Sequence, residues 1–235
     1  MKTRLVVSSV AAGLLLALPV AAKDKEKPEA PKIAIPDAGV PQIMTLEGRF
    51  VRVAYNNEGY AVLGYRVANL SVGEKWMLLD IGLTLRDKVP EYTLTRDAIA
   101  ISTPDGKSIP MASNEEFRTA PLEALDRRAR IQSDSINYFP PQATVACRIG
   151  FFADIDQGGQ SYDQVTLNSQ RGCMGRIFFH LPDGIARGQH WLDVQFDKSV
   201  VRVPFRIFTD EEYKTLDKNY KDIEQQVKDA FKPKG

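Results

Sequence analysis

The chain has 235 residues, of which 43% are hydrophobic and 26% are charged, a composition typical of one globular domain with tails. Its 31 lysines and arginines nearly balance its 30 aspartates and glutamates. Because neither sign of charge dominates, the composition argues against a nucleic-acid partner.

The first 22 residues have the three parts of a secretory signal peptide. Lys2 and Arg4 give a positive start, residues 5–18 form an apolar stretch, and the small residues at 20–22 suit cleavage after position 22. The alternative is an uncleaved anchor, because the apolar run approaches the ~20 residues that span a bilayer. Pro19 and the small residues favour cleavage. We therefore expect an exported protein, either periplasmic or extracellular.

Residues 23–44 are typical of an extended, proline-rich spacer. Four prolines lie among alternating charges there, and prolines at this density interrupt helices and strand ladders. Short apolar pieces of the spacer could still dock as an edge strand. We expect the folded domain to occupy residues 45–208 and a C-terminal helix to occupy residues 209–235.

Strand-like runs separated by turn residues recur through the domain. The cleanest alternation falls between residues 79 and 85, where every second side chain is leucine or isoleucine. The pattern predicts a mainly β fold with about eight or nine strands, as in an antiparallel sandwich or barrel. The predicted strands are residues 48–55, 60–67, 76–85, 92–102, 143–152, 176–181, 190–196 and 199–208.

Between residues 114 and 131 the pattern becomes helical. Pro121 suits a first helical turn, and Arg127, Arg128 and Arg130 give the short amphipathic helix a basic face. Those arginines fit a solvated helix face, with an anion site as the alternative.

The last segment predicts a second amphipathic helix. Thr209 or Asp210 can cap it, and acidic residues follow at the positive end of the helix dipole. Apolar residues then repeat at alternating spacings of three and four. This stripe either packs on the domain or pairs with another copy or a partner. Its members are Tyr213, Leu216, Tyr220, Ile223, Val227 and Ala230.

Cys147 and Cys173 are the two cysteines, and in an exported protein they predict one disulfide. A zinc site would need both of them to meet His180 and His190, and the cysteines lack the short paired spacing of structural zinc sites. In an alternating strand His180 shares a face with Phe178, so we expect it at the core edge or surface. We expect His190 on a rim. Neither histidine lies in a nucleophile motif, so the sequence predicts no catalytic residue, metal or cofactor.

The segment between the cysteines, residues 153–172, holds the candidate recognition loop. Asp154 and Asp156 precede two glycines and resemble the start of a calcium loop, but the fifth and twelfth positions would be Gly158 and Val165, which cannot supply the expected ligands. Asp163 could substitute in another geometry. The alternative is a solvated, glycine-relaxed loop.

Aromatic residues gather around this loop, at Tyr138, Phe139, Phe151, Phe152 and Tyr162. Most of them fit roles in the core or in loop packing. Long loops on rigid sheets often contain binding sites. The tip of this loop is therefore a candidate binding surface, with the residues Asp154, Asp156, Tyr162 and Asp163.

Two segments carry a family resemblance. Residues 77–110 contain a long apolar strand followed by TLTRDAIAISTPDGKSIP, and residues 175–196 read GRIFFHLPDGIARGQHWLDVQF. Together they resemble telokin-like immunoglobulin-fold domains of uncharacterised exported bacterial proteins. The resemblance covers about half the chain. It implies an immunoglobulin-like antiparallel β-sandwich with no known enzyme chemistry, and it carries over no functional residues. The mid-chain helix, the cysteine loop and the C-terminal helix depart from it.

These features support two hypotheses of function. The first is an extracytoplasmic, non-enzymatic binding or assembly module whose partner is an unknown protein or cell-envelope component, with possible self-association through the C-terminal helix. The alternative is a hydrolase or carbohydrate-active enzyme that uses carboxylates such as Asp154, Asp156 and Asp163.

Overall fold

The structure is a computed structural model that describes residues 42–155 and 159–230. The described chain is mainly β, with twelve strands, four α-helices and one 3-10 turn. The predicted signal peptide and nearly all of the predicted spacer lie outside the described residues. The spacer was expected to run to residue 44, whereas the first strand already begins at Ile43.

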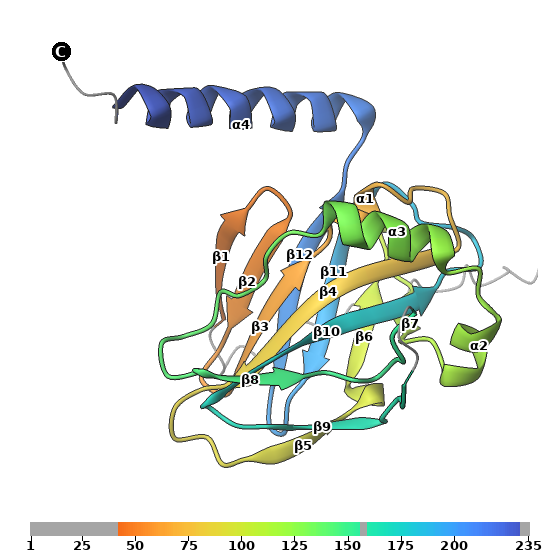
Figure 1. Ribbon diagram of the computed structural model, residues 1–235, viewed down its shortest axis with the longest axis vertical. Helices are drawn as coiled ribbons and strands as arrows, with labels where there is room; N and C mark the ends of the chain where they lie inside the picture. The colour runs from red at the N-terminus through yellow and green to blue at the C-terminus, as the bar shows by residue number, and fades with distance from the viewer. Residues whose placement is uncertain (1–41, 156–158, 231–235) are drawn as a thin grey trace, which may run out of the picture.

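Six strands form the larger sheet, in the order β1-β2-β3-β4-β10-β8 (Figure 1). Neighbouring strands run antiparallel except β8 and β10, which are parallel. The strands are β1 (Ile43–Gly48), β2 (Val51–Tyr55), β3 (Gly59–Gly64), β4 (Trp76–Leu85), β10 (Arg171–His180) and β8 (Val145–Arg148).

Two smaller antiparallel sheets complete the β structure. The four-stranded sheet has the order β12-β11-β6-β7, with β12 (Val200–Ile207), β11 (Gly188–Gln195), β6 (Ile99–Ser102) and β7 (Ser108–Pro110). The two-stranded sheet pairs β5 (Tyr92–Thr95) with β9 (Gln164–Leu167). In Figure 1 strands β11 and β12 lie behind β3, β4 and β10.

One continuous core lies between the six-stranded sheet and the four-stranded sheet. The odd-numbered residues of β4 from Leu79 to Leu85 are fully buried on one face, as predicted, but Leu78 and Thr84 on the opposite face are fully buried too. On β12, Val201, Val203 and Ile207 are buried as well. Burying each such side chain stabilises the fold by roughly 1.5–3 kcal/mol before the entropy cost of ordering the chain.

The helices lie outside the sheets. Helix α1 (Arg66–Asn69) and helix α3 (Glu123–Gln132) lie next to each other at one end of β4, and the short α2 (Asn114–Thr119) precedes α3. Helix α4 (Asp210–Ala230) follows β12. Within the described part of the chain, no helix has both the length and the apolar character needed to cross a membrane.

A segment that we call the strap, residues 133–141, crosses the outer face of the larger sheet. Glycines make room for its side chains: a Cβ placed on Gly82 or on Gly172 would lie 2.8 Å from the ring of Phe139. A Cβ on Gly64 would lie 2.9 Å from Ile136. The strap therefore fits closely against glycines on three strands.

Two predicted elements are split in the structure. Residues 92–102 were expected to form one strand, but a 3-10 turn at Arg96–Ala98 separates β5 from β6, which belong to different sheets. The predicted helix over residues 114–131 is also two helices. Pro121 has no N–H to donate and forces Ala120 before it into an extended conformation, with ψ of 141°.

Other predicted boundaries are also corrected. Strand β3 ends at Gly64, and residues 66–69 form α1 instead of continuing the predicted strand. Strand β8 has only four of the ten residues expected over 143–152, because the chain turns inward after Arg148 and buries Ile149 and Phe151. Strand β10 begins five residues earlier than predicted and includes Cys173.

Candidate functional site

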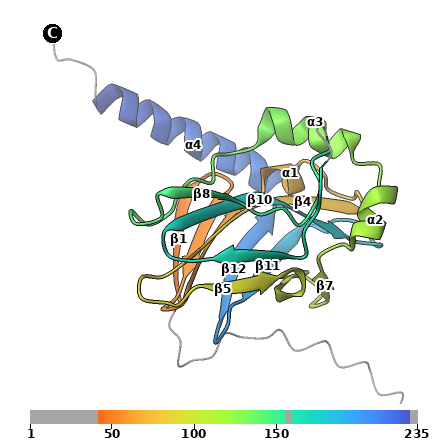
Figure 2. The same ribbon diagram turned by 60° about the horizontal axis from the view of Figure 1, so that its bottom comes forward.

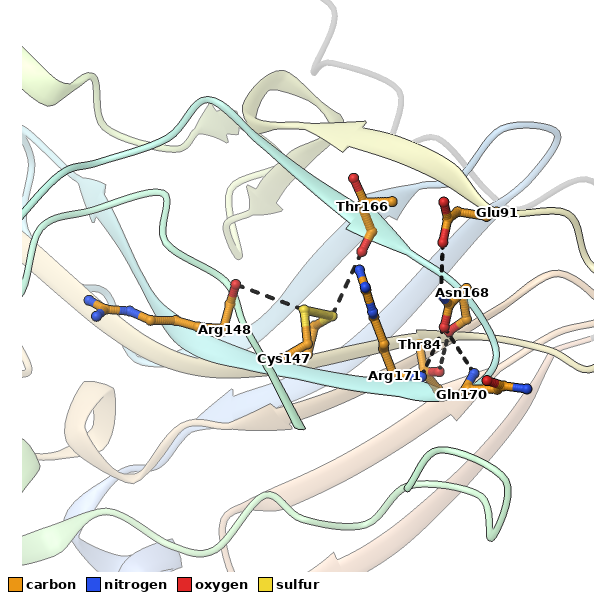
Figure 3. The surroundings of a disulfide bond; sticks show 9 residues. Thr84, Glu91, Cys147, Arg148, Thr166, Asn168, Gln170 and Arg171 are labelled. Carbon is orange, nitrogen blue, oxygen red and sulfur yellow. Dashed lines mark hydrogen bonds between the residues drawn. A yellow bond between two sulfur atoms is a disulfide. The ribbon is translucent and has the colours of Figure 1, made fainter. Parts of the chain in front are cut away.

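The disulfide predicted between Cys147 and Cys173 is present (Figure 3). The two cysteines are directly opposite each other in the parallel β8–β10 pair, with their Cα atoms 4.1 Å apart. Cys173 is fully buried, whereas Cys147 lies on an edge strand whose other residues are exposed. The disulfide therefore fixes the exposed edge strand β8, and the strap that leads into it, to the neighbouring strand β10 of the larger sheet.

The chain between the cysteines contains a β-strand and is not a single long loop. Part of it is β9, and Asn168 shapes the turn from β9 to β10. As Figure 3 shows, the Asn168 side chain accepts hydrogen bonds from the backbone N–H groups of Gln170 and Arg171 and donates one to Glu91 over 2.8 Å.

The three described residues of the predicted recognition surface do not share one partner. Asp154 pairs with Arg148 at 2.7 Å, and Asp163 pairs with Arg96 at 3.2 Å. Tyr162 is 56% exposed. Asp156 lies outside the described residues. Each described carboxylate thus has its own arginine, and the described part of the chain contains no group of three potential metal ligands.

Arg96 organises this region, and the sequence analysis did not single it out. Its guanidinium donates to the backbone oxygens of Ala112 and Phe151, and it lies 4.5 Å from the ring centre of Phe152. It also donates to Asn114, at the start of α2. Burial lowers the pKa of Arg96, and the hydrogen bond that Arg96 donates to Asp163 opposes that shift. The only sequence signal was a charged residue inside a predicted strand.

A groove of about 670 Å³ lies between the α2–α3 region and residues 153–155 and 159–161. Phe117 and Leu122 form an almost buried apolar floor, and Ile155 lines the groove from the loop. Arg118 is exposed at its edge and makes no ion pair within the described chain. The predicted recognition loop therefore borders a concave surface that is mostly apolar at its base.

The aromatic residues noted in the sequence divide between two environments. Phe151 and Phe152 are buried, and Phe152 contacts the rings of Phe117 and Phe178. Phe139 packs on the glycines under the strap, while Tyr138 and Tyr162 are exposed. Most of this set is core, as expected.

The two histidines lie apart from the cysteines. His180 stacks on Trp76 with ring centres 4.9 Å apart, and its Nδ1 is 3.8 Å from Glu116, which agrees with the predicted edge position. The predicted rim position of His190 is wrong. His190 is fully buried and stacks on Phe205, and burial lowers its pKa.

The basic face predicted for α3 is mostly neutralised by carboxylates. Arg128 makes two hydrogen bonds to Glu74, and Arg130 pairs with Asp126 at 2.7 Å. Arg127 is exposed. These pairs favour the structural interpretation of the arginines over an anion site.

Below α3, a buried ion network connects the helix to the larger sheet. Asp126, 4% exposed, accepts a hydrogen bond from Arg176 of β10 over 3.1 Å. Arg176 also lies 3.7 Å from Asp80 of β4, which accepts a hydrogen bond from Ser133. Burial raises the pKa of Asp80 to about 6, because the opposing effects of Arg176 and Ser133 are smaller.

Helix α4 is attached to the body through its first turns. Thr209 caps it, with reciprocal hydrogen bonds between the backbone and side chain of Thr209 and those of Glu212. Phe50 stacks on Tyr213 with ring centres 6.0 Å apart, and Arg49 pairs with Asp217 at 2.7 Å. No side chain between residues 210 and 222 is buried. Figure 2 shows the C-terminal end of α4 projecting away from the sheets.

Comparison of the chain with protein-family models, with curated proteins and with solved structures finds no match.

Proposed function

We propose that the chain is an extracytoplasmic, non-enzymatic binding or assembly module, in which α4 contacts a protein or another component of the cell envelope. The observation that carries this proposal is the geometry of α4. It is 21 residues long, it meets the body near its first turns, and its described side chains are at most partly buried. A helix with an apolar stripe gains most of its stability from tertiary or intermolecular packing.

The predicted fold and compartment are part of this proposal. Two largely antiparallel sheets around one core support an immunoglobulin-like sandwich, although the parallel β8–β10 pair and the extra strands depart from a simple version of it. The disulfide is compatible with an oxidising compartment outside the cytoplasm, as the predicted signal peptide requires.

The attachment of α4 supports the same function. Arg49 and Phe50 occupy the short turn between β1 and β2 and supply the contacts to Asp217 and Tyr213. The Arg49 guanidinium also lies 4.8 Å from the ring centre of Tyr220. These contacts orient the helix while the described stripe residues Tyr213, Leu216 and Tyr220 stay only partly buried, so part of each side chain is accessible to a partner or a second copy.

The test compares residues 23–235 with a version that ends at Phe208. We expect the longer chain to show either a larger mass in light scattering or specific cross-links in a cell-envelope extract, and we expect the shorter chain to lose both while keeping its melting temperature. The same number of subunits and the same cross-links for the two versions would contradict the proposal.

The hydrolase hypothesis has no specific observation in its favour. Asp154 and Asp163 are each paired with a different arginine, so neither described carboxylate faces the other as a free acid and base would.

A further inference from the structure

Strand β1 forms one edge of the six-stranded sheet, and its side chains are exposed. In the described part of the chain β1 pairs only with β2, so its other side is an open edge (Figure 1). Five of its six residues are exposed, among them Ile43 at 52%, Met44 at 51% and Leu46 at 61%. Apolar side chains on an open strand edge favour pairing with another strand.

The edge strand β12 of the four-stranded sheet is protected, in contrast to β1. The amide side chains of Gln42, Asn56 and Asn69 form hydrogen bonds with the backbone of β12, and Pro204 within this strand has no N–H to offer. Among the described residues, no side chain forms a hydrogen bond with the backbone of β1 between Ile43 and Glu47. The two edges are therefore treated differently within one molecule.

The register of the sheet shows which backbone groups of β1 face the open edge. The N–H groups of Asn56 and Tyr65 form hydrogen bonds at the two ends of the β2–β3 pair, so the even-numbered residues of β2 bond to β3. The odd-numbered residues of β2 therefore bond to β1. Because Met44 lies opposite Ala54, the backbone N–H and C=O groups of Met44 and Leu46 point away from β2.

This arrangement is self-complementary. A second β1 can lie antiparallel to the first with a two-fold axis at Thr45, so that the backbone of Met44 in one copy bonds to that of Leu46 in the other. Their side chains share one face of β1 and cover each other, and the two Thr45 residues form a favourable cross-strand pair. Glu47 is the only charged residue of β1. The two copies of Glu47 lie at opposite ends of the joint, so like charges do not meet.

The preceding residues of the same chain match this edge less well. Residues 23–41 contain four prolines among alternating charges. A proline cannot donate a hydrogen bond to a strand ladder, and charged side chains gain nothing beside Met44 and Leu46. The same short apolar edge in a second copy is the better match.

Helix α4 lies on the side of the open edge. It contacts the β1–β2 turn through Arg49 and Phe50, and Figures 1 and 2 show its C-terminal end beyond β1. Stable interfaces bury roughly 1,200–2,000 Å², more than a pair of short strands supplies. A second copy bound at β1 would also contact α4, which supplies additional area.

We propose that two copies of the chain join through their β1 strands about a two-fold axis, so that their six-stranded sheets become continuous. The α4 helix of each copy then reaches over the other copy. This inference rests on the proposed assembly role for the area that α4 adds, whereas the strand pairing can be tested separately.

The first test is sedimentation velocity of residues 23–235 over a range of concentrations. We expect a dimer whose dissociation constant rises about tenfold or more in Met44→Pro, which removes an N–H at the open edge, and in Leu46→Lys. Both positions are exposed, so the melting temperature of the monomer should change little. Ile131→Lys, at a 72% exposed position of α3, is the matched control and should leave the dimer intact.

A cysteine test fixes the register. Residues at position 45 of the two copies would form a directly opposite pair without hydrogen bonds, with Cα atoms about 4.5 Å apart, which suits a disulfide. Thr45→Cys should therefore give a covalent dimer under oxidised glutathione. Ile43→Cys is the matched control. It should give little, because its two copies would lie about 13 Å apart.

The outcomes separate this proposal from the role of α4. A chain that stays monomeric, a dimer that neither edge variant weakens, or equal coupling of the two cysteine variants would overturn the β1 pairing. A dimer that persists when the chain ends at Phe208 would support the pairing and contradict the role of α4. Envelope cross-links that depend on α4 in a monomeric chain would support that role and overturn the pairing.

Discussion

Helices α3 and α4 are both amphipathic in sequence, but they relate to the sheets in different ways. Helix α3 buries Leu125 and Ala129 and inserts the carboxylate of Asp126 into an ion network on the outer face of the larger sheet. Helix α4 is twice as long, yet none of its side chains is buried up to residue 222. The described contacts of α4 include the β1–β2 turn, Arg187 just before β11, and Arg206 near the end of β12.

This difference separates a structural helix from a helix that is available to a partner. Burial of apolar area and of hydrogen-bonded charge makes α3 part of the cooperative fold. The contacts of α4 are mostly partly exposed rings and ion pairs, and exposed ion pairs contribute little to stability. An amphipathic stripe in a sequence therefore does not by itself show whether the surface that covers it belongs to the same chain.

The largest expected effect concerns the disulfide that joins β8 to β10. Replacing both cysteines by alanine should lower the free energy of unfolding by about 3–4 kcal/mol, because the disulfide restricts the unfolded chain. It should also loosen β8 and the strap while leaving α4 unchanged. Urea denaturation measures the stability, and hydrogen exchange measures the local effect. If hydrogen-exchange protection fell as much in α4 as in the strap, the result would contradict the distinction between the two helices.

The next effect compares one leucine from each helix. Leu125→Ala on α3 should cost about 2–3 kcal/mol, since this side chain is 2% exposed. Leu216→Ala on α4 is the matched control and should cost less than about 1 kcal/mol, because the side chain is only partly buried. Chemical denaturation of both variants measures the contrast, and equal costs would contradict it.

The ion network under α3 predicts a pH-dependent stability. The pKa of Asp80 is about 6 in the folded chain and about 4 in an unfolded one, so the folded state binds the proton more tightly. The contribution of Asp80 is therefore fully present below about pH 4 and is lost as pH rises through about 6.

The variant Asp80→Asn tests this directly. At pH 7.5 it should raise the free energy of unfolding by about 2 kcal/mol, after allowance for weaker contacts with Arg176 and Ser133. Near pH 3.5 the difference from the original chain should vanish. Melting curves across this pH range provide the measurement, and a variant that is less stable at pH 7.5 would show that the charged form of Asp80 is needed.

The smallest expected effect on stability is at the attachment of α4. Arg49→Ala removes the partner of Asp217 and the cation over Tyr220, so it should leave the melting temperature unchanged while increasing exchange of the α4 amides. Arg66→Ala is a contrasting variant, because Arg66 pairs with Asp134 of the strap and lies over the ring of Phe50. Greater destabilisation by Arg49→Ala than by Arg66→Ala would contradict this ranking.

The features that depend on local pattern could be predicted from the sequence. The alternating leucines and isoleucine of β4 indicated one of its two buried faces, and the Thr209 cap and the disulfide follow from local chemistry and from cysteine number. The burial of His190 could also have been predicted, because alternation places it on the inward face with Leu192 and Val194.

Features that depend on contacts between distant segments could not be predicted. Nothing near Arg96 in the sequence indicates that its guanidinium contacts Phe151 and Asp163. Arg96 lies at the break between β5 and β6. The strap likewise depends on Gly82 and Gly172, whose fit to Phe139 exists only after the strands pair.

Hydrogen exchange on monomeric residues 23–235 tests the central claim most directly, by comparing the amides of α3 with those of α4 in one experiment. We expect α3 to exchange as slowly as β4 and β10, through global unfolding, and α4 to exchange much faster through local opening. Protection of α4 equal to that of α3 in the monomer would show that α4 is an integral part of the fold, and it would contradict the account.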